Sequence, residues 1–124
     1  MKTVDVLIKA REYIVSGWGQ GAYCNRADEK DEKDCYCCAL GAIGMATPGC
    51  YPNVRASKKY PENTPAARYL NQVVSPDRLG MCIAAWNDDP FRTLDEVLKA
   101  FDKAIANAKR RHINGGRVAA RAAK

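Results

Sequence analysis

Two short segments hold most of the side chains that could do chemistry in this chain. Residues 37–43 read Cys-Cys-Ala-Leu-Gly-Ala-Ile, and residues 83–88 read Ile-Ala-Ala-Trp-Asn-Asp. The first suggests thiol chemistry at Cys37 or Cys38, because the positive end of a helix dipole stabilises a thiolate near the helix start. Cys38 would then be the nucleophile of a cysteine-dependent hydrolase or transferase.

Such an enzyme would need partners for the thiol. Gln20 could donate a hydrogen bond to an oxyanion, and Asn87 and Asp88 could orient a base. The base itself is missing from the pattern, because the single histidine, His112, lies in a basic tail. Cysteine hydrolases of the familiar type need an imidazole beside the thiol. We therefore keep Cys38 as a candidate nucleophile but favour binding over catalysis.

The second hypothesis is a polar pocket for a ligand. Its floor would be indole, from Trp86 and, if both tryptophans line one cleft, Trp18, and its rim would be polar: Gln20, Asn87, Asp88 and Arg92. Stacking combined with hydrogen bonds suits a small polar ligand such as a nucleotide. In the alternative, structural reading, Trp86 buries its ring in the core, Asn87 and Asp88 turn the chain, and Arg92 pairs with Asp88.

Six cysteines lie in the chain, five of them within residues 24–50. We interpret Cys38 and Cys82 as small buried hydrophobic residues. Adjacent residues of a helix point about 100° apart, which does not suit the tetrahedral ligands of structural zinc. We therefore predict no metal and no cofactor, and a disulfide would require an oxidising compartment.

Hydrophobic periodicity predicts helices that must position these groups, over residues 3–16, 35–46, 64–74 and 79–86 and from residue 94 onward. Thr93 and Glu96 form a capping box for the last of them. Gly41 and Gly44 each cost a helix about 1 kcal/mol relative to Ala, so we expect another element to cross this helix closely. The predicted fold is all-α, a compact bundle of four or five helices.

The chain has 124 residues, which fits one domain. We expect a helical domain over residues 1–111 and a mobile basic tail over residues 112–124. Residues 99–124 hold eight of the 20 Lys and Arg residues and one of the 14 acidic residues. Nucleic-acid binding through this tail is a further alternative, although the tail lacks interleaved aromatic residues. With neither a membrane span nor a signal-peptide pattern at the start, we expect a cytoplasmic protein.

Four motifs in this order also resemble a known family: Trp18-x-Gln20-Gly21-Ala22, residues 38–43 (Cys-Ala-Leu-Gly-Ala-Ile), residues 83–88, and Arg92-Thr93-x-x-Glu96-Val97-Leu98. The chain is similar over residues 4–107 to a family of small proteins of bacteria and tailed phages, a domain of unknown function. The resemblance implies a compact helical domain and a phage or prophage setting, with no assigned activity. The charged segment 25–34 and the extra cysteines depart from the family pattern.

Together these observations predict a phage or prophage accessory protein. It would act by binding a host protein or a small polar ligand such as a nucleotide.

Overall fold

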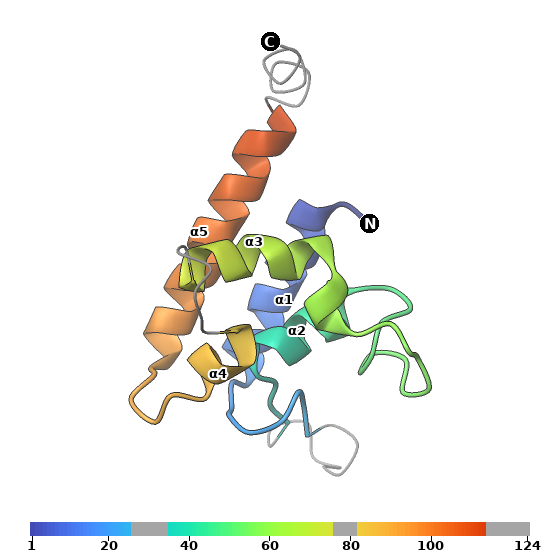
Figure 1. Cartoon of the computed structure of the whole chain (residues 1–124), viewed down its shortest axis with the longest axis vertical. Coiled ribbons are helices and arrows are strands. Elements are labelled where there is room, and N and C mark those ends of the chain that lie inside the picture. Colours follow the sequence, from blue (N-terminus) through green and yellow to red (C-terminus); the bar gives the residue numbers. More distant parts are fainter. Residues whose placement is uncertain (26–34, 76–81, 114–124) are drawn as a thin grey trace.

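The computed structural model describes residues 1–25, 35–75 and 82–113. Its helices are α1 (Thr3–Ser16), α2 (Ala39–Ala46), α3 (Pro65–Val74), α4 (Ile83–Asn87) and α5 (Leu94–Ile113), with a 3-10 turn, η2 (Pro61–Asn63), before α3. Within those ranges the chain forms two isolated β-bridges and no strand. The predicted all-α fold is confirmed. Figure 1 shows α3 crossing α5, which extends beyond the other helices toward the C-terminus.

Helix α2 forms the centre of the core. Seven of its eight residues are buried, and the helix packs against α1, α3 and α4. The largest fully buried apolar side chains come from α1, α2, α3 and α5: Leu7, Ile14, Ile43, Leu70, Val97 and Phe101. A helix buried on all sides must be apolar all round, and the segment Ala-Leu-Gly-Ala-Ile-Gly-Met-Ala meets that condition.

The two glycines of α2 lie against the backbone of other segments. A close neighbour was predicted here because glycine weakens a helix. A Cβ at Gly41 would overlap the carbonyl oxygen of Tyr23, and a Cβ at Gly44 would overlap that of Tyr51. The close neighbours are therefore the loops before and after α2, and not a crossing helix. Glycine is needed here because any side chain would push these loops off the core.

Local capping signals gave the correct start of two helices. The Thr64 hydroxyl accepts a hydrogen bond from Ala67 N–H (3.2 Å) at the start of α3. At the start of α5, the Thr93 hydroxyl accepts from Glu96 N–H (3.2 Å), and the Glu96 carboxylate accepts from Thr93 N–H (2.9 Å). This reciprocal pair is the predicted capping box.

Two predicted helix boundaries were wrong. The helix predicted from residue 35 begins at Ala39, because residues 35–37 are extended and bond to other loops. The helix predicted over residues 79–86 is observed as α4 from Ile83 onward, while residues 79–81 lie outside the described residues. Helix α5 continues through Ile113, past the expected domain end at residue 111.

The rest of the predicted basic tail, residues 114–124, lies outside the described residues. In the part of the chain that the structure describes, no helix has the length and apolar character needed to cross a membrane.

Candidate functional site

Cys37 ties two loops to the start of α2. Its N–H donates to Gly17 O (2.9 Å), and its carbonyl accepts from Gly19 N–H (3.2 Å) in a parallel bridge. On its other side, Cys37 forms an antiparallel bridge with Cys24, and the two residues are joined by a disulfide with Cα atoms 4.0 Å apart. Directly opposed residues of an antiparallel pair bring their side chains together. The pairing places the two cysteines where a disulfide can join the loop before α2 to the start of that helix.

Asn87 is the hub of the site. Its Oδ1 accepts hydrogen bonds from Trp18 Nε1–H (2.7 Å) and Ala39 N–H (3.0 Å). Its Nδ2 donates to Gly19 O (3.1 Å) and to Asp88 Oδ1 (3.0 Å). An amide has two N–H donors and an oxygen with two lone pairs, so all its capacity is used within the chain. The Asn87 side chain is 0% exposed.

Gln20 and Asp88 extend this network to the surface. Gln20 Nε2 donates to the carbonyl oxygens of Asn87 (2.9 Å) and Asp89 (2.7 Å), and Asp88 Oδ1 accepts from Gly21 N–H (3.0 Å). We call Trp18, Gln20, Asn87 and Asp88 the polar clasp. The structure brings these predicted site residues together, and they hydrogen-bond to one another.

Arg92 and Trp86 pack together beside the polar clasp. The Arg92 guanidinium carbon lies 4.1 Å from the centroid of the Trp86 ring, and Arg92 Nε donates to Trp86 O (2.9 Å). The predicted pairing of Arg92 with Asp88 is wrong: Arg92 pairs with Glu96 (3.3 Å) and Asp89 (3.9 Å). Trp86 is half-buried, so its expected burial in the core is only partial.

Phe91 is the residue that sequence reasoning missed. It lies in the loop of residues 88–93 between α4 and α5, and it is 88% exposed. The loop is ordered by local bonds: Phe91 N–H donates to Asp89 Oδ1 (2.9 Å), and Arg92 N–H donates to Asp89 O (2.9 Å). The sequence feature that could have identified Phe91 is its position: an aromatic residue directly after Pro90 that does not belong to the apolar stripe of α5.

The model of a family of unknown function, DUF6197, matches residues 1–107. The chain belongs to the DUF6197 family. No curated protein and no solved structure matches the chain. The polar clasp, Cys38 and Phe91 all lie within the part that DUF6197 covers, whereas the end of α5 and the basic tail lie beyond it.

The candidate nucleophile of this DUF6197 domain is buried. Cys38 is the N-cap of α2, its sulfur accepts a hydrogen bond from Gly41 N–H (3.3 Å), and it is 4% exposed. Burial raises the pKa of the Cys38 thiol, and this effect outweighs the hydrogen bonds from Gly41 and Leu40, which lower it. A reactive cysteine needs a lowered pKa and access to solvent, so these observations favour a capping role.

The expectation that the chain binds no metal stays a prediction. Cys35 and Cys38 have the Cys-x-x-Cys spacing, and both are buried. In residues 1–25, 35–75 and 82–113, no three His, Cys, Asp or Glu side chains gather as metal ligands would.

Thiol labelling of the native protein tests the role of Cys38. Cys82 is exposed, contrary to the prediction that it is buried. We expect a neutral alkylating reagent to modify Cys82 about 100-fold faster than Cys38 under non-reducing conditions, because access and thiolate fraction both control the rate. Peptide mass spectrometry over time measures both rates. Equal rates at the two sites would restore Cys38 as a candidate nucleophile.

Proposed function

We propose that this protein works by binding a partner protein through the loop that carries Phe91, as an accessory protein of the phage or prophage type. The exposure of Phe91 is the observation that supports this most. Removing a Phe side chain from water is worth about 1.5–3 kcal/mol, and the fold makes almost no use of it here. Aromatic anchors of this kind dominate many protein interfaces.

The order of the Phe91 loop supports the same proposal. Gln20 of the polar clasp bonds the Asp89 carbonyl, and Arg92 is held by the Trp86 carbonyl and ring. A loop that is already fixed in its bound conformation has little entropy to lose on binding. We therefore interpret the polar clasp as a support for the loop.

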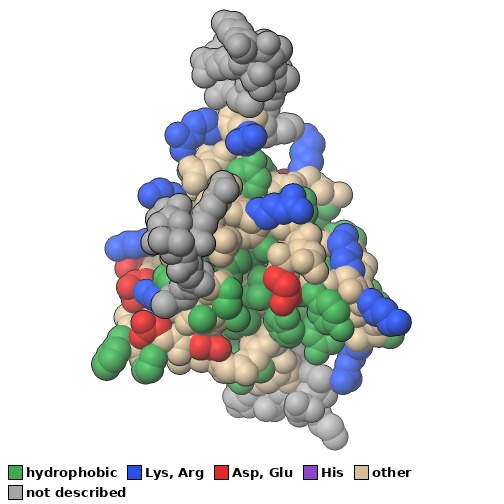
Figure 2. Space-filling model, viewed as in Figure 1, with side chains coloured by type: hydrophobic (Ala, Val, Ile, Leu, Met, Phe, Trp, Pro, Cys, Tyr) green, Lys and Arg blue, Asp and Glu red, His purple; other side chains and the backbone are tan. Residues whose placement is uncertain are grey.

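The charge around Phe91 indicates the chemistry of the partner. Asp88, Asp89, Asp95 and Glu96 lie within a few residues of it, against two cations in the same stretch, Arg92 and Lys99. Figure 2 shows hydrophobic side chains protruding with acidic side chains beside them, in the region where Figure 1 places the loop between α4 and α5. Complementary charge sets orientation and association rate. We therefore propose a partner with an apolar pocket edged by Lys or Arg.

The other candidate functions stay predictions with less support. The burial and raised pKa of Cys38 weigh against the cysteine-dependent enzyme. Nucleic-acid binding would rest on tail residues that lie almost wholly outside the described residues and outside the family match. A small polar ligand at the polar clasp has less support, because the Asn87 side chain already makes its hydrogen bonds within the chain.

The compartment is also a proposal. We proposed the cytoplasm on sequence grounds, and the Cys24–Cys37 disulfide weighs against it, because disulfides persist mainly in oxidising compartments. Mass spectrometry of the protein isolated under alkylating, non-reducing conditions decides between the two. A pair of unmodified cysteines supports an oxidising compartment, and alkylation at both Cys24 and Cys37 supports the cytoplasm.

Photo-cross-linking tests the binding proposal. A benzophenone amino acid replaces Phe91 in one variant and Val54, an exposed hydrophobic residue in the loop before η2, in the matched control. We expect one host protein to cross-link at position 91 and not at position 54. That protein, once purified, should bind the wild-type chain. Absence of a product specific to position 91, or no binding by the purified protein, would contradict the proposal.

A further inference from the structure

We infer that the cleft between α2, η2, α3 and α4 binds a small molecule that joins an apolar body to an amine- or amidine-type head. The cleft has a volume of about 370 Å³. Small-molecule sites typically measure about 300–1,000 Å³. This site is separate from the Phe91 loop and does not rest on the proposed function.

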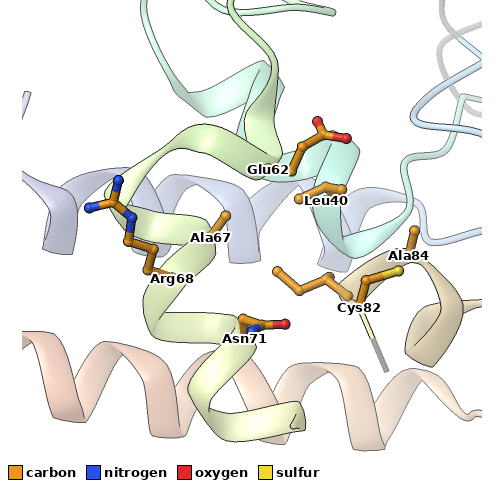
Figure 3. Close-up of a pocket in the computed structure, with 8 residues that line it drawn as sticks. Leu40, Glu62, Ala67, Arg68, Asn71, Cys82 and Ala84 are labelled. Atoms are coloured by element: carbon orange, nitrogen blue, oxygen red, sulfur yellow. The ribbon is translucent and has the colours of Figure 1, made fainter. Parts of the chain in front are cut away.

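The walls of the cleft are apolar and come from three helices. Leu40 of α2, Ala67 of α3, and Ile83 and Ala84 of α4 line it. The two alanines leave space that a larger side chain would fill. Figure 3 shows Leu40, Ala67 and Ala84 around the opening between the helices. Such walls suit a ring or a short aliphatic chain, since ligand sites are mostly apolar with a few placed polar groups.

Glu62 supplies the charge at the cleft. Its carboxylate oxygens lie 2.7 and 2.9 Å from the Tyr23 hydroxyl, which donates to them. Burial, followed by this hydrogen bond, raises the pKa of Tyr23, so the phenol remains a donor at neutral pH. An ionised carboxylate has about four acceptor positions. Glu62 therefore keeps acceptor capacity for a ligand after Tyr23 has bonded to it.

Asn71 adds a neutral polar group to the same space. Its amide is half-buried, and in Figure 3 it points into the cleft. Within the described part of the chain, no hydrogen bond satisfies it, so it can donate to or accept from a ligand. A half-buried amide gains more from a partner than a fully solvated one does.

The local charge selects the head group of the ligand. Arg68 also borders the cleft, but Figure 3 shows its guanidinium turned away from Glu62 and Asn71. The negative charge of Glu62 is therefore not neutralised where a ligand would lie. A cation or an N–H donor is favoured there and a phosphate is disfavoured. The head group of the ligand is therefore an amine or an amidine.

Protection of Cys82 provides the test, because this exposed thiol lines the cleft. The probes are benzamidine and phenethylamine, with benzoate as the anionic control of similar size. A probe that binds with a millimolar dissociation constant and is present at about 10 mM should slow alkylation of Cys82 about threefold or more. We expect this from both cationic probes and no slowing from benzoate. Equal protection by benzoate, or none by either cation, would overturn the inference.

Variants in the cleft and outside it separate binding in the cleft from indirect effects. Glu62→Gln should abolish protection by benzamidine, whereas Asp95→Asn, which removes an exposed carboxylate on α5 outside the cleft, should keep it. Phe91→Ala should also keep it, so failure of the cleft and failure of the proposed protein interface give different results. Undiminished protection in Glu62→Gln would overturn the assignment of the head group. If Glu62→Gln does not fold, Ala84→Phe, which fills the cleft, must remove the protection instead.

Discussion

Replacing Asn87 with alanine is expected to lower the free energy of unfolding by about 3–5 kcal/mol. The substitution removes the acceptor of Trp18 Nε1–H and Ala39 N–H and the donor to Gly19 O. Each polar group left unpaired in the interior costs about 1–3 kcal/mol. Urea denaturation followed by tryptophan fluorescence measures the loss, and Trp18 itself should report the broken hydrogen bond.

The matched control for this variant is Asn53→Ala. Asn53 is an exposed asparagine in the turn after Pro52, and we expect its replacement to change stability by no more than about 0.5 kcal/mol. A loss below about 1 kcal/mol for Asn87→Ala would mean that solvent reaches the clasp. The closed network would then be the wrong description of the site.

Replacing Gly41 with alanine is expected to lower the free energy of unfolding by about 2–4 kcal/mol. A Cβ at this position overlaps the Tyr23 carbonyl. That carbonyl cannot move away freely, because it accepts a hydrogen bond from Cys38 N–H (2.9 Å) and the next residue, Cys24, is in the disulfide. Helix propensity alone would make the variant more stable by about 1 kcal/mol, so the sign of the change separates the two effects.

The exchange Ala106→Gly calibrates the propensity effect. Ala106 is exposed on α5, where we expect a loss of about 1 kcal/mol from propensity alone. Thermal unfolding of both variants, compared with the wild type, measures the difference. A Gly41→Ala protein as stable as the wild type would show that the Tyr23 segment does not press on α2.

Local signals predicted the helices well where the chain ends each helix by itself. The bounds of α1 follow from hydrophobic periodicity and from Gly17 at its end. The bounds of α3 follow from Thr64 and Pro65 at its start. Each of these signals acts within a few residues. The start of α2 could not be predicted in this way. Cys37 bonds to residues 17–19 and pairs with Cys24, and such tertiary pairing overrides the helical tendency of its neighbours.

The sequence named the residues of the polar clasp, but it did not indicate their hydrogen bonds and it did not indicate Phe91. The unusual combination of Trp18, Gln20 and the Trp86–Asp88 segment indicated that these residues meet. Whether these residues form an open pocket depends on how many hydrogen bonds Asn87 makes within the chain. That number depends on the three-dimensional positions of its partners, which the sequence pattern does not give. Phe91 was missed because single hydrophobic residues in loops are common. Only its exposure in an ordered loop distinguishes it.

The central claim is that the polar clasp holds a loop whose exposed Phe91 anchors a partner protein. The most direct test is the affinity of the Phe91→Ala variant for the purified cross-linked partner. We predict that the dissociation constant rises about 30-fold or more, as for other aromatic anchors. The free energy of unfolding should change by no more than about 0.5 kcal/mol. A change in affinity of less than about threefold, or a loss of stability above about 1 kcal/mol, would contradict the account.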